Sequence, residues 1–158
     1  MHSRLTLERE LHDLLGTGRD AGIAARYYGL DGRGGCTLQT VGIEIGLTSE
    51  RVRQIVTAAS EWVRTARPVS PTLERTITFV VDQIPAAARE IEAKLRSQRL
   101  TSGLFRLEGV IKAAELLGKR LPFSISEVGE ARLVYAPRNS GLIQVAQRKR
   151  RVDQFITA

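Results

Sequence analysis

The side chains best suited to specific chemistry in this chain of 158 residues are concentrated between positions 48 and 57. Arg can donate two hydrogen bonds to guanine, Gln can pair with adenine, and Glu can accept from cytosine, so this group could recognise base edges in duplex DNA. A helix that reads DNA uses mainly its N-terminal residues. The candidate DNA-contacting residues of this segment are Thr48, Ser49, Glu50, Arg51, Arg53, Gln54 and Thr57. The same string also fits the solvated face of an ordinary amphipathic helix, and spacing alone leaves both interpretations open.

Residues that serve catalysis or metal binding are scarce. Cys36 is the single cysteine, and His2 and His12 are the only imidazoles, which excludes a disulfide framework, a Cys-based zinc site and most catalytic constellations. The Gly-rich segment 29–35 runs into Cys36-Thr37 instead of the Gly-Lys-Ser/Thr of a phosphate loop, so we interpret it as a tight connector. We therefore expect no enzyme activity, no catalytic residue, no metal site and no cofactor.

Two helices joined by a tight turn would position the candidate residues. Helices are predicted first over 5–15 and 19–28, from the helical spacing of their apolar residues. Thr37 then caps a helix over 38–45, Gly46-Leu47 forms the turn, and Thr48 caps a helix over 49–64. Gly42 would let the last two helices approach closely. Apolar residues fall on one face of the last helix, at Val52, Ile55, Ala59, Trp62 and Val63. This pattern predicts a helix-turn-helix.

Three strings in this half resemble region four of bacterial sigma factors: RYYGLDG at 26–32, TLQTVG at 37–42 and GLTSERVRQI at 46–55. In that family the module is a helical domain that reads the promoter −35 element and lies on the RNA polymerase β-flap. The resemblance covers about residues 5–66. It implies that Thr37 and Leu38 contact the phosphate backbone, and that Glu50, Arg51, Arg53 and Gln54 face bases and phosphates in the major groove.

The sequence departs from that family at two positions of the recognition helix and in what is missing elsewhere. Ser49 stands where primary sigma factors usually carry Arg, and Val56 stands where an acidic residue is common, so the same target sequence is not implied. The eight aromatic residues are scattered, and no basic, aromatic-rich helix that could stack on a melted strand is present. We do not expect this chain to melt promoters by itself.

The second half reads as a small winged helix. Pro68 and Pro71 end the preceding helix, so we place a linker at 67–71 between a domain over 1–66 and a domain over 72–137. The second domain is predicted to contain three helices followed by two short strands, at 72–84, 86–97, 106–117, 121–125 and 132–135. The third of these helices offers Arg106, Glu108, Lys112 and Glu115 to solvent. Its two acids would repel phosphate, so a protein-contact or scaffolding role is as well supported as DNA reading.

The C-terminal segment 138–158 is predicted to form a basic helix. Its four adjacent basic residues, together with a basic residue of the Gly-rich loop, are candidate phosphate contacts: Arg148, Lys149, Arg150, Arg151 and Arg33. A solvated tail is the alternative for the C-terminal four. The helix also contains apolar residues, which would be exposed to water if it stood alone. We therefore expect it to dock on a partner, to form a homodimer or larger complex with a second copy, or to begin a further domain.

Charge supports an acidic partner. The formal net charge is +7 and the sequence pI is about 10.3. Residues 1–66 hold eight basic and eight acidic residues, whereas 67–125 hold ten and six, and 126–158 hold six and three. No apolar run approaches the roughly 18–20 residues that cross a membrane, and the N-terminus mixes charges with Leu, unlike a signal peptide. We therefore expect no membrane contact and a cytoplasmic, nucleoid-associated location.

These observations together predict a mainly α bacterial protein with a helix-turn-helix domain, a small winged-helix domain and a two-stranded β-hairpin. The expected function is sequence-specific binding of double-stranded DNA in transcription regulation. The alternative is an adaptor or assembly subunit whose two domains contact RNA polymerase or another protein.

Overall fold

The computed structural model describes residues 5–137 and Gly141. These residues form seven α-helices and a small three-stranded antiparallel sheet, so the fold is mainly helical, as predicted. None of the described helices is long and apolar enough to cross a membrane. The elements are α1 (Leu7–Leu14), α2 (Gly18–Tyr28), α3 (Leu38–Ile45), α4 (Ser49–Ala66), α5 (Pro71–Gln83), β1 (Ala86–Ala87), α6 (Ala88–Ser97), α7 (Leu107–Leu116), β2 (Ser124–Val128) and β3 (Ala131–Tyr135).

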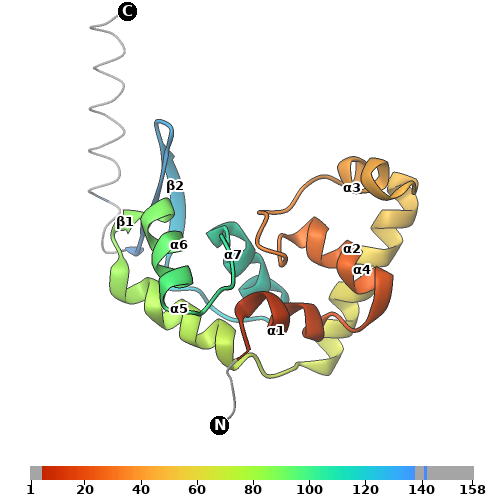
Figure 1. Ribbon diagram of the computed structural model, residues 1–158, viewed down its shortest axis with the longest axis horizontal. Helices are drawn as coiled ribbons and strands as arrows, with labels where there is room; N and C mark the ends of the chain where they lie inside the picture. The colour runs from red at the N-terminus through yellow and green to blue at the C-terminus, as the bar shows by residue number, and fades with distance from the viewer. Residues whose placement is uncertain (1–4, 138–140, 142–158) are drawn as a thin grey trace, which may run out of the picture.

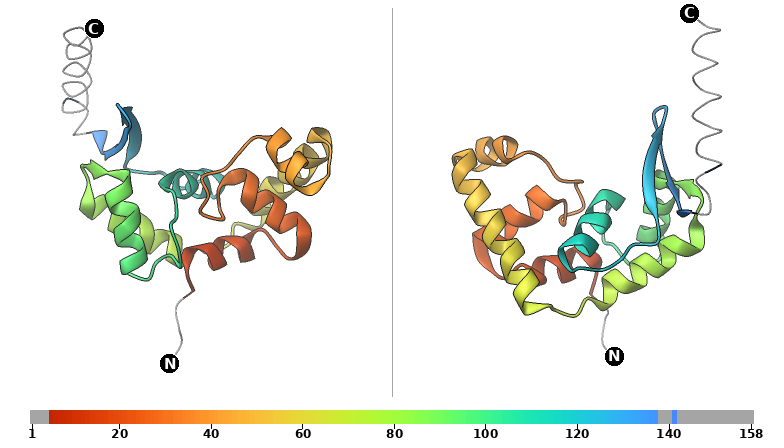
Figure 2. Two further views of the ribbon diagram at one scale, coloured as in Figure 1. Left: turned by 45° about the horizontal axis from the view of Figure 1, so that its top comes forward. Right: turned by 180° about the vertical axis from the view of Figure 1, so that it is seen from behind.

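The helix α7 lies between two groups of elements (Figure 1). On one side α2, α3 and α4 pack together, and on the other side α5 and α6 accompany the sheet, an arrangement that is also visible from behind in Figure 2. α7 contacts α2 and α4 from the first group and α5 from the second. Buried side chains from both groups form one continuous cluster.

The first helix connects segments that are far apart in the sequence. The carboxylate of Glu10 accepts hydrogen bonds from the backbone N–H groups of Thr72 and Leu73, each at 2.9 Å, and so caps the start of α5. The Glu8 carboxylate accepts from the backbone N–H of Ser102 at 3.0 Å. α1, from the predicted first domain, thus contacts residues of the predicted second domain. The division into two domains stays a prediction.

A third strand was missed by the sequence analysis. The prediction of a helix from 86 and of only two strands was wrong, because Ala86 and Ala87 form β1 and pair with Val134 and Leu133 of β3. The sheet order is β1-β3-β2. Pro85 separates the two alanines from α5, and alanine carries little strand preference, so the pairing comes from tertiary contact with β3.

The predicted hairpin is present, with different strand limits. The strand expected over 121–125 is β2, which begins at Ser124 and continues to Val128. Pro122 has no N–H to donate, so pairing starts only after it. At the other end, Gly129 has a φ of 75°, which allows a tight turn and extends the ladder until Val128 pairs with Ala131.

Candidate nucleic-acid interface

Threonine caps fix the starts of α3 and α4. The Oγ1 of Thr37 accepts a hydrogen bond from the backbone N–H of Thr40 at 3.0 Å, and the Oγ1 of Thr48 accepts one from the backbone N–H of Arg51 at 3.1 Å. The sequence analysis predicted both caps, and both are confirmed. Each cap satisfies an N–H that the first turn of a helix would otherwise leave without a partner.

The turn between α3 and α4 requires glycine at two positions. Gly46 has a φ of 74°, in the left-handed region, and its N–H donates to the Gly42 carbonyl at 2.8 Å. A Cβ on Gly42 would lie 2.5 Å from the carbonyl oxygen of Leu47. Gly42 was expected to make room for the second helix. In the structure, Gly42 makes room for the Leu47 carbonyl of the turn, which packs directly against α3.

The buried face of α4 differs from the prediction at two residues, Trp62 and Val56. Val52, Ile55 and Val63 are buried as predicted. The prediction that Trp62 faces the core was wrong, because 58% of this residue is exposed, and Val56 is buried in its place. Successive helix residues are rotated by about 100°, which puts position 62 at the edge of the stripe that Val52, Val56 and Val63 define.

The opposite face of α4 presents the predicted polar residues to solvent: Ser49, Glu50, Arg51, Arg53, Gln54 and Thr57 are all exposed. Two pairs of these side chains contact each other. Glu50 accepts two hydrogen bonds from Arg53, from Nε at 2.9 Å and from Nη2 at 2.5 Å. The Nη1 of Arg51 donates to the Oε1 of Gln54 at 3.4 Å. The structure therefore brings these candidates together on one surface.

The Glu50–Arg53 pair changes the titration of both groups. Hydrogen bonds from Arg53 lower the pKa of the Glu50 carboxyl, and hydrogen bonds to Glu50 raise the pKa of the Arg53 guanidinium. Both side chains are exposed, and an exposed ion pair is worth little in water. An incoming phosphate or base could therefore replace Glu50 as the partner of Arg53 at small cost.

The helix α2 holds α3 and α4 in place. Arg26 donates to both oxygens of the Glu44 carboxylate, with Nε–Oε2 and Nη2–Oε1 distances of 3.2 Å. These hydrogen bonds lower the pKa of Glu44 and raise that of Arg26. The hydroxyl of Tyr28 donates to the Val56 carbonyl of α4 at 2.7 Å, and burial raises the Tyr28 pKa. Sequence analysis placed Arg26 and Tyr28 in the string resembling sigma factors but gave neither a supporting role.

The Gly-rich loop is a packed connector. A Cβ on Gly29 would lie 2.7 Å from the backbone nitrogen of Gly35, so the loop closes tightly on itself. Its Gly32 carbonyl accepts a hydrogen bond from the backbone N–H of Arg106 at 3.0 Å. Burial raises the pKa of the Cys36 thiol.

The remaining candidate phosphate contacts are not part of the α4 surface. Arg33 is exposed and lines a groove together with Arg106 and residues of β2, and none of the α4 candidates lines that groove. The other four, Arg148, Lys149, Arg150 and Arg151, lie outside the described residues, as does nearly all of the predicted C-terminal helix.

The helix α7 is engaged inside the molecule. Gly109 is buried so close to the Gly29 carbonyl that a Cβ there would overlap it. The Nζ of Lys112 lies 5.4 Å from the centroid of the Tyr28 ring, in a cation–π arrangement. One face of α7 therefore lies against the end of α2 and the loop that follows it.

A buried carboxylate that the sequence analysis missed fixes the start of α7. Glu92 of α6 is 2% exposed and accepts from the backbone N–H of Leu107 at 2.8 Å. It also accepts from Arg132 of β3, with Nη2–Oε1 at 2.8 Å, and these bonds raise the pKa of Arg132. Arg132 binds Glu108 as well. The sequence did contain a signal for this role. Glu92 lies within the apolar stripe of its helix, and the next helix begins without a residue that could cap it.

No protein-family model, curated protein or solved structure matches this chain, so the resemblance to sigma region four stays a prediction. Within the described residues, no group of three or more His, Cys, Asp or Glu side chains could hold a metal ion.

Proposed function

We propose that the chain is a sequence-specific double-stranded-DNA-binding regulator of transcription in which α3 and α4 form a helix-turn-helix. α4 would lie in the major groove with segment 50–54 at the base edges, while Thr37 and Leu38 contact phosphates. The observation that carries the proposal is the exposed polar surface on the first turns of α4. That surface stands on a helix held by the Thr48 cap, the Gly42 turn and α2.

The chemistry of this surface supports DNA as its partner. Guanidinium and amide groups lie side by side on α4, and their present partners are exposed groups on the same helix, so base edges can replace them. The first turn of α3 contains no acidic residue that would repel a phosphate near its free N–H groups. The net charge of +7 acts in the same direction over longer distances.

In the second half, the proposed architecture is a winged helix formed by α5, β1, α6, α7, β2 and β3. Its third helix, α7, packs against α2 and α4. The proposal therefore assigns DNA reading to α4 alone and gives the winged-helix half a supporting role.

The same packing of α7 favours a second candidate function. In the second half, the helix that would read DNA in a winged helix packs against other helices of the same chain. This suits an adaptor or assembly subunit that contacts RNA polymerase or another protein, with DNA contact incidental. The two candidates differ in whether loss of the α4 guanidinium groups abolishes function.

Fluorescence anisotropy with random-sequence duplex DNA at two salt concentrations tests the first candidate. We expect binding at low salt that weakens steeply as salt rises, with a slope of about −0.9 in log affinity per log salt for each phosphate contacted. A selection for the target site would follow.

The double variant Arg51→Ala/Arg53→Ala should bind its selected site about a hundredfold more weakly or worse, since each lost base contact costs about tenfold or more. Arg89→Ala/Arg96→Ala is the matched control, because it removes two exposed guanidinium groups from α6 instead. Equal affinities for these two variants would contradict the DNA-reading role of α4 and favour the adaptor.

A further inference from the structure

Among the described residues, the outer edge of β2 has backbone groups that pair with no strand. β2 ends the sheet order β1-β3-β2, so none of the described strands pairs with its other edge. Gly129 and Glu130 form the turn of the hairpin, and the pair that flanks a two-residue turn exchanges both of its hydrogen bonds. Counting back from Val128, the N–H and C=O groups of Ile125 and Glu127 point away from β3.

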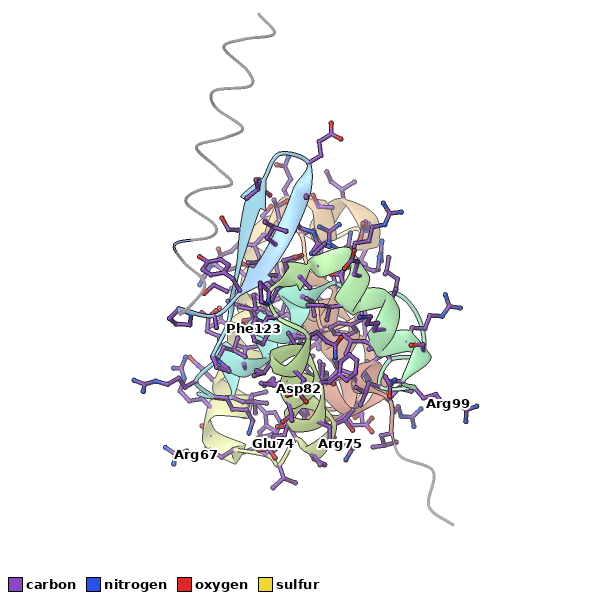
Figure 3. All side chains as sticks on the ribbon, turned by 90° about the vertical axis from the view of Figure 1, so that its left-hand side faces the viewer. Arg67, Glu74, Arg75, Asp82, Arg99 and Phe123 are labelled. Atoms are coloured by element: carbon purple, nitrogen blue, oxygen red, sulfur yellow. The ribbon has the colours of Figure 1, made fainter. Side chains whose placement is uncertain are left out.

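Ile125 and Glu127 of this strand also line a groove of about 700 Å³. The hairpin stands on one side of α7 and the loop before α3 stands on the other (Figure 1). Phe123, at the base of the hairpin in Figure 3, lines the groove together with Ile111 and Ile125. The loop side contributes Gly34 and Gly35. An open strand edge beside apolar side chains is the usual setting for a peptide that binds by adding a strand.

Two guanidinium groups add positive charge to this groove. The side chain of Arg33 has neither a hydrogen-bond acceptor nor an ion-pair partner among residues 5–137. Arg106 reaches only a long contact of 3.4 Å with Glu108, whose carboxylate is also bound by Arg132. A Cβ on Gly34 would lie 2.8 Å from the Cδ of Arg106, so the absence of a side chain there makes room for Arg106.

We propose that the groove binds an extended acidic segment of a partner protein, which adds a strand to the sheet at β2. The backbone of this segment would pair with Ile125 and Glu127, and its Asp or Glu side chains would pair with Arg33 and Arg106. A DNA duplex fits this surface poorly, because a nucleic acid has no peptide backbone that could pair with the edge of a β-strand. The site is separate from the α4 surface and does not depend on DNA binding.

The probe is a pool of seven-residue peptides in which Asp or Glu alternates with Val, Ile or Thr, and the matched pool carries Lys or Arg at the acidic positions. Amide hydrogen exchange in the intact chain gives the readout. Before any peptide is added, the amides of Ile125 and Glu127 should exchange faster than the amide of Val128. The acidic pool should slow both amides by about tenfold or more, and the basic pool should not. Absence of protection by the acidic pool, or equal protection by both pools, would overturn the proposal.

Two substitutions at one position separate strand pairing from side-chain effects. Glu127→Pro removes an outward N–H while leaving the β2–β3 ladder intact, and should weaken binding of the acidic pool by about tenfold. Glu127→Ala keeps the N–H and should bind at least as tightly as the parent chain. Equal loss in the two variants would overturn strand addition, and circular dichroism confirms that each variant is folded.

Further measurements test the identity of the occupant. Arg33→Glu/Arg106→Glu should abolish binding of the acidic pool, whereas Arg51→Ala/Arg53→Ala should leave it unchanged whether or not the proposed DNA binding holds. Protection of Ile125 by duplex DNA instead of peptide would replace the proposal with a nucleic-acid site. A dimer in ultracentrifugation that Glu127→Pro dissociates would replace it with self-association.

Discussion

The starts of α4 and α7 contain similar residues and differ in what surrounds them. α4 is capped by its own Thr48, and the Glu50–Arg53 ion pair of its first turns is exposed. α7 is capped by Glu92 from another helix, and this carboxylate also binds Arg132 where water is largely excluded. One helix start is open to a partner, and the other is closed by the fold.

The difference shows that a Glu–Arg pair has no fixed role. An exposed pair adds little to stability and exchanges partners readily, which suits a surface that binds a charged ligand. A desolvated pair is costly to break, because removing one member leaves the other without compensation. The partners of a charged residue, more than its presence on a helix face, decide whether it serves recognition or architecture.

Removing the cap of α7 should produce the largest effect. Glu92→Ala leaves the Leu107 N–H unpaired and takes one of two carboxylate partners from Arg132. We expect the free energy of unfolding to fall by about 3 kcal/mol, the lower end for a broken buried pair, because Arg132 keeps Glu108. Urea denaturation measures this change in the free energy of unfolding. Glu115→Ala, which removes an exposed acid of α7, is the control and should change stability far less. Similar values for the two variants would contradict the comparison.

Removing the cap of α4 should have a smaller effect. Thr48→Ala takes away the oxygen that accepts from the Arg51 N–H, and we expect a loss of about 1 kcal/mol in unfolding free energy, with faster exchange of the Arg51 amide. Thr48→Ser keeps the hydroxyl and should retain most of the stability. Arg106→Ala, at the corresponding position before α7, removes no capping bond. A loss of stability in Thr48→Ser equal to that in Thr48→Ala would show that the cap is not the cause.

The smallest effect concerns the pH dependence of the exposed pair. The pKa of Glu50 is lowered in the folded chain, so the contribution of this pair is complete above the ordinary glutamate pKa and is lost as pH falls through the lower folded value. An NMR titration of the Glu50 carboxyl should give a midpoint below the ordinary glutamate value. In Arg53→Ala the midpoint should return toward that value. An unchanged midpoint in the variant would mean that Arg53 does not hold Glu50 in solution.

Local signals predicted the helices well. Thr37, Thr48 and Gly46 mark helix boundaries by groups that act within four residues, and these boundaries are confirmed. β1 could not be predicted in this way, because Ala86 and Ala87 become a strand only through pairing with β3, far along the chain. Helix boundaries set by neighbouring residues are legible in a sequence, whereas elements set by distant partners are not.

The same limit applies to the surface of α4. Helical periodicity predicted that residues 49–57 would include an exposed polar group, and this exposure is confirmed, while DNA contact stays a prediction. Periodicity failed for Trp62, at the edge of the stripe, where small changes in packing decide burial. It also gave no indication that Glu10 and Glu92 cap other helices, since nothing near either residue identifies its partner.

The position of α1 has a consequence for how the chain folds as it is made. The N–H groups that Glu10 and Glu8 bind belong to Thr72 and Ser102, which lie 62 and 94 residues further along. A ribosome releases the N-terminal end first, so α1 emerges long before these groups exist outside the exit tunnel. The nascent chain can form α2, α3 and α4 early, but α1 reaches its final contacts only when the segment around Ser102 has been synthesised.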